Sequence, residues 1–284
     1  MSQSVLFDAP GPRTVRRHRL YTVLTVLALL ALVAFAGYRL DQEGQFEGDK
    51  WEVFVTPSYV EFILVDGLLE TLKMAVGGIV GAMVLGVVLG VGKLSDHALV
   101  RVPCWAVVEL FRAIPVLMLM IVLFFLWGIY HGSAGPFWCV VAALTLYNGA
   151  VLAEVFRAGI LAVPAGQAEA AYGIGMRKSQ VMSVVLLPQA VKIMIPAIIS
   201  QCVVTLKDTS LGYAIAAPGL TAVARPIYLE FQNHVPVYVV IAGIYVAANL
   251  LLTVVATFAQ KRFVGEKKVL DVPMVGEAQA TEKA

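Results

Sequence analysis

The chain has 284 residues, of which 60% are hydrophobic and 14% are charged, and its mean hydropathy is +0.83. These values exclude an ordinary soluble domain and indicate a polypeptide whose main solvent is lipid. The net charge of +2 is too small to suggest nucleic acid as a partner, so the positions of the cations matter more than their number.

Six apolar runs are each long enough to cross a hydrocarbon core of about 30 Å, which takes about 20 helical residues. Strands are excluded because the runs are long and because open sheet edges would be unsatisfied in lipid. The sequence therefore predicts an all-α integral membrane protein with about six transmembrane helices. The runs cover residues 20–40, 61–91, 103–130, 136–161, 188–206 and 236–260.

The first run follows a basic segment and precedes an acidic loop, and two interpretations of it stay open. Ala34-Phe35-Ala36 resembles the cleavage site of a signal peptide. The run continues through Tyr38 and Leu40, however, which favours a retained accessory helix. The predicted organisation is a basic N-terminal segment, the accessory helix, the acidic loop, a core domain and a tail, at residues 1–19, 20–40, 41–60, 61–260 and 261–284.

Lysines and arginines gather in the connections that lie on one side of the membrane if the N-terminus is cytosolic. We therefore expect a multi-pass protein of the plasma membrane with both termini in the cytosol. The cytosolic set is Arg13, Arg16, Arg17, Arg19, Lys93, Arg101, Arg177, Lys178, Lys261, Arg262, Lys267 and Lys268. The opposite side keeps Arg39, Lys50, Lys207 and Arg225.

The second run carries four glycines at spacings that let helix backbones approach closely in lipid. These are Gly77, Gly81, Gly86 and Gly90. We expect them to serve helix packing rather than ligand contact.

A short motif occurs twice, with Glu109 and Arg112 in the third run and Glu154 and Arg157 in the fourth. In each copy the glutamate and the arginine stand three positions apart and share a helix face. Counting 1.5 Å per residue from the cytosolic helix ends places both copies about 10 Å inside the membrane, where they can meet. Two interpretations stay open: salt bridges that hold the bundle together, or a cytoplasmic gate.

The fifth run ends in Lys207-Asp208-Thr209-Ser210 and is followed by a semi-apolar stretch. Such a break places charges and free backbone groups beside a cavity rather than in lipid. The cluster is therefore a candidate for a substrate path, and Asn148, in the middle of the fourth run, is a further candidate. The alternative is a surface pair of Lys207 and Asp208 at a helix end.

A polar island, QAEAAYGIGMRKSQVMSVVLLP, separates the fourth run from the fifth. Glu169-Ala170-Ala171 favours a helix, Gly175 permits a sharp turn, and Pro188 marks entry into the next apolar run. Arg177 supplies a cation. The pattern predicts a helix-turn-helix on the cytosolic face of the membrane.

Three segments of the chain resemble the polar amino-acid import permeases of the ATP-binding-cassette superfamily, most closely the glutamate-type permeases of actinobacteria. The island has the spacing of the EAA loop of that superfamily's import permeases, with Val185 where isoleucine is frequent. Asp208 stands where asparagine is commoner in the family. The three segments are VELFRAIPVLMLM, YNGAVLAEVFRAGILAVPAGQAEAAYGIGMRKSQ and LKDTSLGYAI.

The resemblance implies a type I importer fold whose EAA coupling helix docks onto an ATPase. It also implies two cytosolic ATPase subunits, a second permease chain that is identical or different, and an extracellular substrate-binding lipoprotein. ATP and Mg would be bound by the partner ATPases, with no cofactor on this chain. The expected cargo is glutamate or another polar amino acid.

Two other classes of protein compete with this interpretation. An ion-coupled secondary amino-acid carrier usually has repeated halves with paired broken helices, and no repeat is visible here. A structural membrane subunit without transport is the other alternative. The chain has no GxxxxGK[ST] phosphate loop and no metal-ligand spacing, so it is expected to have no metal site and to be no enzyme, with ATP hydrolysis in its partners.

Overall fold

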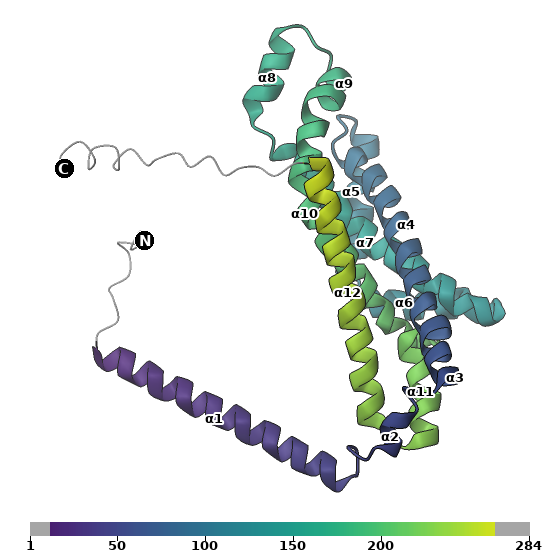
Figure 1. The fold of residues 1–284 in the computed structure, drawn as a ribbon. Coiled ribbons are helices and arrows are strands. Elements are labelled where there is room, and N and C mark those ends of the chain that lie inside the picture. The colour runs from purple at the N-terminus through teal and green to yellow at the C-terminus, as the bar shows by residue number, and fades with distance from the viewer. Residues whose placement is uncertain (1–11, 265–284) are drawn as a thin grey trace. The chain divides into compact units, whose positions relative to one another are not determined.

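The computed structural model describes residues 12–264, and within this range the chain is helical with no strand (Figure 1). Five helical segments are long and apolar enough to cross a membrane, and a bent pair of helices makes a sixth. The predicted all-α class and the approximate number of spans are therefore confirmed. The five segments are Arg13–Gln42, Pro57–Lys93, Gly132–Leu161, Lys178–Ile215 and His234–Arg262.

The third predicted span is not one continuous helix. Helix α5 (Ala98–Ala113) and the following segment, Val116–Tyr130, which begins with α6 (Val116–Leu126), meet at an angle of 101°. Ile114 adopts an extended conformation, with φ −86° and ψ 126°. Pro115 disfavours helical geometry at the preceding residue and supplies no backbone N–H, so the helix breaks here. The expectation of an unbroken span over residues 103–130 is corrected accordingly.

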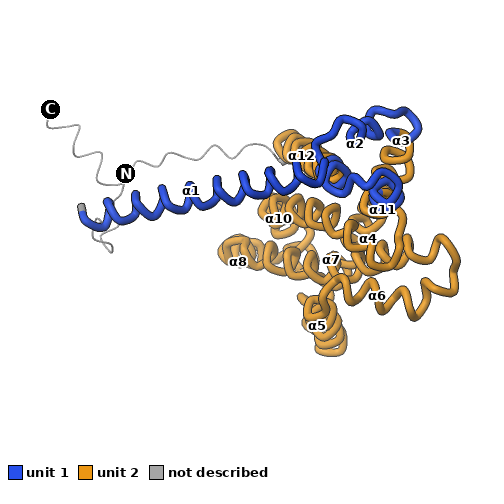
Figure 2. Tube along the Cα trace, turned by 90° about the horizontal axis from the view of Figure 1, so that it is seen from below, with its two compact units in different colours: residues 1–60, 224–240 blue, residues 61–223, 241–284 orange. Residues whose placement is uncertain are grey.

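The chain divides into two compact units, Met1–Val60 with Ala224–Val240 and Glu61–Val223 with Ile241–Ala284 (Figure 2). In the first unit, α1 (Pro12–Gln42) runs without a break through Ala34-Phe35-Ala36. The acidic stretch after it contains the short helix α2 (Asp49–Glu52). It is tied to α11 (Leu220–Phe231) and the residues that follow, because Tyr59 donates to Glu230 at 2.9 Å and Asn233 donates to the carbonyl of Lys50 at 2.8 Å.

The second unit is a helical bundle whose main contact lies between α4 (Glu70–Lys93) and α7 (Gly135–Leu161). Glycines of α4 permit this approach. A β-carbon at Gly86 would lie 2.8 Å from Leu152, and one at Gly90 would lie 3.0 Å from the carbonyl oxygen of Ala153. The packing role expected for these glycines is confirmed.

The remaining helices of this unit extend the bundle. A π-helical segment, η1 (Phe62–Leu69), follows α3 (Pro57–Glu61) and leads into α4. The π-helical η4 (Val181–Leu186) leads into α10 (Leu187–Asp208), and a 3-10 segment, η5 (Thr209–Ile215), continues from it. Helix α12 (His234–Val264) ends the described chain.

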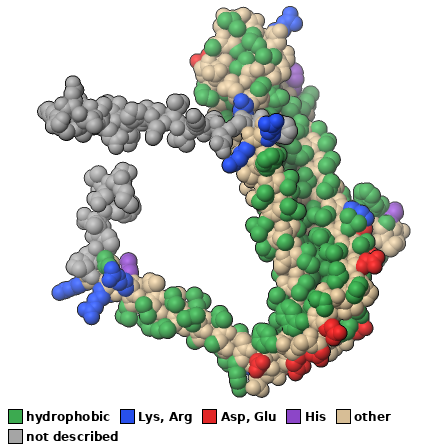
Figure 3. Space-filling view, viewed as in Figure 1, with side chains coloured by type: hydrophobic (Ala, Val, Ile, Leu, Met, Phe, Trp, Pro, Cys, Tyr) green, Lys and Arg blue, Asp and Glu red, His purple; other side chains and the backbone are tan. Residues whose placement is uncertain are grey.

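The outward faces of the long helices are apolar. On α4 the exposed side chains include Val76, Val80 and Val84, at four-residue spacing, while Ala82 and Gly86 on another face are buried. Hydrophobic side chains cover the long helices in the same way in Figure 3. A surface of this kind suits a lipid environment, in which the small residues face a neighbouring helix and the branched residues face the acyl chains.

Of the predicted terminal segments, residues 1–11 and the tail from residue 265 onward, including Lys267 and Lys268, lie outside the described residues.

Candidate functional site

The polar island forms the predicted helix-turn-helix. Helix α8 (Ala165–Gly173) is followed by a turn and by α9 (Lys178–Gln180). Gly175 has φ +83°, a backbone conformation that residues with a β-carbon rarely adopt. Arg177 precedes α9, and its backbone N–H donates to the side chain of Gln180 at 2.8 Å. Pro188 lies in the first turn of α10, directly after the π-helical segment Val181–Leu186, and supplies no backbone N–H there.

The three residues of the Glu169-Ala170-Ala171 motif do not share one surface. Glu169 and Ala170 are exposed, whereas Ala171 is buried at 5% exposure. The loop instead exposes two large apolar side chains, Tyr172 and Ile174, the latter at 81% exposure. An exposed, partly apolar helix and turn of this kind suits the groove of another protein.

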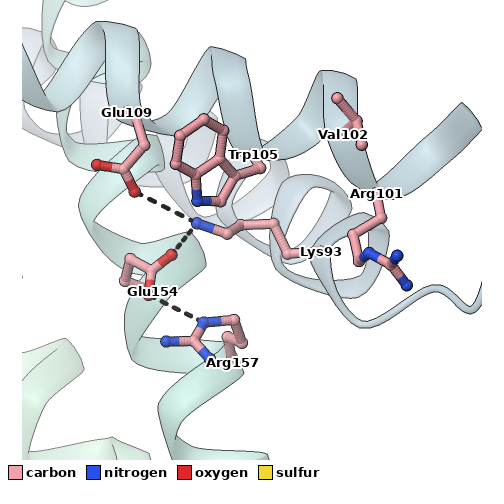
Figure 4. A pocket seen from close by; sticks show the side chains of 7 residues that line it. All are labelled: Lys93, Arg101, Val102, Trp105, Glu109, Glu154 and Arg157. Carbon is pink, nitrogen blue, oxygen red and sulfur yellow. Dashed lines mark hydrogen bonds and ion pairs between the residues drawn. The ribbon is translucent and has the colours of Figure 1, made fainter. Parts of the chain in front are cut away.

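A cluster of charges joins three helices (Figure 4). Lys93, at the end of α4, pairs with Glu154 of α7, and its ammonium lies 3.6 Å from a carboxylate oxygen of Glu109 of α5. The lysine side chain is only 5% exposed. Within their own helices, Glu154 pairs with Arg157 at 3.0 Å and Glu109 with Arg112 at 3.6 Å.

The predicted direct pairing of the two Glu/Arg motifs is therefore corrected. Among the described residues no arginine of one motif reaches the glutamate of the other, because Lys93 lies between the two carboxylates. Sequence reasoning placed Lys93 in a solvated cytosolic connection. One signal could have identified Lys93 as part of the cluster. It lies three residues after Gly90, on a helix whose small residues already predicted close contact with a neighbouring helix.

A cavity of about 410 Å³ adjoins this cluster. Its wall includes Arg101 and the half-exposed Trp105 of α5, next to Lys93 and Glu109 (Figure 4). Glu109 is 42% exposed, whereas Glu154 is 21% exposed. The side chains of the cluster on α5 are therefore the more exposed ones and form the longer ion pairs, whereas those on α7 are less exposed and form shorter ion pairs.

Lys207 and Ser210 line a second cleft, also of about 410 Å³, opposite the polar face of α12 that carries Tyr245, Asn249 and Thr253. Because Asn249 is the middle residue of α12, Lys207 lies opposite the centre of a membrane-crossing helix. Its assignment to the outer connections is corrected. In the described part of the chain Lys207 has no ion pair within 4.0 Å, although its charge acts on the neighbouring carboxyl of Asp208.

The other candidates for the path lie elsewhere. Thr209 is buried and its hydroxyl donates to the carbonyl of Leu206 at 2.6 Å. Asn148 is fully buried between α7 and α10, where its side-chain oxygen accepts a hydrogen bond from Gln201. Neither residue lines the Lys207 cleft in this state.

A further ion pair ties the polar island to the bundle. Lys178 of α9 pairs with Asp96, which lies in the connection between α4 and α5. The hydrogen bond from Lys178 and its charge hold the pKa of the Asp96 carboxyl below its ordinary value. Sequence reasoning had no signal for this contact, because the two residues are 82 positions apart.

The site holds no sign of metal chemistry within residues 12–264. No three histidine, cysteine, aspartate or glutamate side chains come close enough to hold an ion there. Cys104, Cys139 and Cys202 are unpaired.

Comparison with known proteins gives consistent matches. A family model described as the inner membrane component of binding-protein-dependent transport systems matches residues 78–265. The chain is 38% identical to the glutamate transport system permease protein GluD of Corynebacterium glutamicum over 78% of its length and 83% of that protein. It is 33% identical to the arginine transport system permease protein ArtQ of Bacillus subtilis over 72% and 93% of the two chains.

A solved structure also resembles this protein. It is described as an amino acid ABC transporter with histidines, and it superimposes with a TM-score of 0.68 at 27% identity, over 74% of this chain and 98% of that one.

Proposed function

The chain belongs to the family of inner membrane components of binding-protein-dependent transport systems, and on that premise we propose that it imports glutamate or another polar amino acid. The family makes it a non-catalytic, multi-pass permease subunit of an ATP-binding-cassette transporter rather than an ion-coupled secondary carrier. ATPase and permease partners follow from this membership. The number and identity of the partners, the cargo and the roles of individual residues are proposals.

The polar island is the proposed docking element for an ATPase. Its support is a short exposed helix, a turn at Gly175 that needs a glycine, and the exposed side chains of Tyr172 and Ile174. We propose two cytosolic ATPase subunits, which bind ATP and Mg and lie on the side of this loop. The positive-inside distribution of lysine and arginine supports the proposal that both termini lie in the cytosol.

The proposed assembly is completed by a second permease chain, identical or different, and by an extracellular substrate-binding lipoprotein. When the ATPases close, the docking helices move and the bundle opens its cavity outward to receive substrate. Glu109, Arg112, Glu154 and Arg157 act as a cytoplasmic gate, with Lys93 as the cation that both glutamates share. The weaker contact, between Lys93 and Glu109, is the one that separates first.

The observation that carries the proposed cargo is Lys207, which lines a cleft between two membrane-crossing helices and has no ion pair within 4.0 Å among the described residues. An isolated ammonium group is costly at this depth unless it faces water or an anionic ligand. A substrate carboxylate entering a cavity of low dielectric requires positive charge or several donors to offset its desolvation. An anionic amino acid meets both requirements.

The experiment is uptake of labelled glutamate by the complete importer in proteoliposomes, with arginine and histidine as competitors. We expect glutamate uptake that depends on ATP and that Lys207→Met lowers at least about tenfold, because one charge-assisted contact is lost. Lys192→Met is the matched control, since Lys192 is an exposed lysine of the same helix that does not line the cleft. Preferential uptake of arginine or histidine by the wild type would contradict an anionic cargo.

A further inference from the structure

The polar island is braced internally, so that α8, the turn and α9 are held in one arrangement. The backbone N–H of Gly175 donates to the carbonyl of Tyr172 at 2.9 Å. The backbone N–H of Val181 donates to the carbonyl of Arg177 at 2.9 Å. Hydrogen bonds of the first kind close the end of a helix onto the turn that follows it. A displacement of the exposed helix α8 is therefore passed on to α9.

The connection between α4 and α5 is braced as well. The guanidinium of Arg101 donates to the carbonyl of Ser95 at 3.2 Å and to that of Asp96 at 3.5 Å. At Gly92 the end of α4 lies so close to α5 that the sulfur of Cys104 leaves no room for a β-carbon. The end of α4, the connection and the start of α5 are thus fixed to one another.

One ion pair bridges these two braced segments. Lys178 of α9 pairs with Asp96, and in the part of the chain that the structure describes no other ion pair joins the polar island to α4, to α5 or to their connection. His97 and Arg101 also act on the Asp96 carboxyl through their charge, but neither lies within ion-pair distance of it. The Lys178 and Asp96 side chains are 53% and 74% exposed. An ion pair this exposed contributes little to the stability of a fold.

The connection leads directly into the charge cluster. Asp96 follows Lys93, the last residue of α4, by three positions. The Lys93 side chain pairs with Glu154 of α7 and lies 3.6 Å from a carboxylate oxygen of Glu109 of α5 (Figure 4). A displacement of the connection therefore moves the cation that both glutamates share.

The polar island is thereby attached to both partners of the tighter pair. Through the chain it continues from α7, which carries Glu154, and through the ion pair it holds the end of α4, which carries Lys93. Glu109 lies further along α5 and has no such attachment. When the island moves, Lys93 and Glu154 follow the same element, and the longer contact to Glu109 is the one that is strained.

We propose that Lys178 and Asp96 are positioning residues for transport, whose ion pair passes the movement of the docked polar island to the α4–α5 connection and so to Lys93. This proposal rests on the function proposed above. It assigns the exposed pair a role in coupling rather than in folding. Neither residue touches the substrate or the nucleotide.

The test uses the complete importer in proteoliposomes and measures substrate molecules taken up per ATP hydrolysed. Lys178→Gln and Asp96→Asn should each lower this ratio about two- to fivefold, the range that an exposed ion pair supports. Exchanging the charges, with Lys178→Asp and Asp96→Lys in one chain, should restore part of the ratio. Lys73→Gln is the matched control, since it removes the exposed ion pair with Glu70 near the opposite end of α4.

Two further measurements separate coupling from a structural role. Because the pair is exposed, the single variants should keep the wild-type melting temperature and the wild-type amount of ATPase in the purified complex. A lower melting temperature or loss of the ATPase would make the pair structural and overturn the proposal. An exchanged pair that couples no better than the single variants would overturn it too.

The two proposals fail in different ways. If the wild-type importer shows no ATP-dependent uptake of an amino acid, the proposed function is wrong. If it takes up glutamate while both single variants keep the wild-type ratio of uptake to hydrolysis, the function stands and the ion pair is no route of coupling.

Discussion

Lys93 of α4 and Glu154 of α7 form an ion pair between helices although 61 positions separate them in the sequence. The glycines that draw α4 against α7 bring the two side chains together. The lysine then reaches Glu109 of α5 from the same position, at 3.6 Å. One cation therefore ties α5 to a tightly packed pair of helices.

Replacing Lys93 with Met should destabilise the bundle by about 3 kcal/mol, because Glu154 keeps its contact with Arg157 but loses its buried partner. The measurement is unfolding of the purified complex, with Lys192→Met as the exposed-lysine control. Adding Glu154→Gln to Lys93→Met should recover part of the loss. Strict additivity of the two changes would show that the residues do not interact. A double-mutant cycle for Arg112 and Glu154 should be additive in stability, because each of these residues pairs within its own helix and not with the other.

Gly175→Val should uncouple ATP hydrolysis from uptake, because a β-branched residue at φ +83° costs about 1–2 kcal/mol or more and moves the turn. We expect partial assembly of the complex with uptake reduced several-fold. Gly166→Ala is the matched control, since Gly166 lies in α8 with open space around it and no positive φ. Wild-type uptake and substrate-stimulated hydrolysis in Gly175→Val would refute the docking assignment.

Gly90→Ala should weaken the contact between α4 and α7 by about 1–3 kcal/mol, because the added methyl group meets a backbone oxygen at 3.0 Å and backbone cannot move aside easily. The free energy of unfolding measures this effect. Gly243→Ala, on α12 with nothing within 4 Å, should be neutral or slightly stabilising. Equal stabilities of the two variants would contradict the close packing at Gly90.

The pair of Asp96 and Lys178 predicts a pH dependence for the attachment of the polar island to the connection between α4 and α5. The folded pKa of Asp96 lies below the ordinary value of 3.8, so its contribution to stability is fully present above that value. The contribution is lost as the pH falls through the lowered pKa. A carbon-13 titration of Asp96 should show the lowered pKa, and Lys178→Gln should move it back toward 3.8. An identical titration in the variant would mean that the contact does not form.

Local and repeating features of the sequence were sufficient for the class of protein and for the helix and turn of the polar island. Runs of about 20 apolar residues specify membrane helices because lipid leaves no other way to pair the backbone. The turn at Gly175 was predictable because the conformational freedom of glycine is a property of one residue. The break at Pro115 also has a local cause, because a proline disfavours helical geometry at the residue before it. The break was therefore predictable in principle, although the sequence was interpreted as one span.

Long-range pairing was decided only by the tertiary structure. The sequence located Glu109 and Glu154 but not the lysine between them, and it located Lys207 but neither its depth nor the facing residue Asn249. A side chain's partner depends on how helices pack and rotate, and the apolar pattern of a membrane helix constrains that rotation weakly because lipid and protein interior are both apolar. Composition and spacing thus specify which helices form, whereas the packing of small residues decides which charges meet.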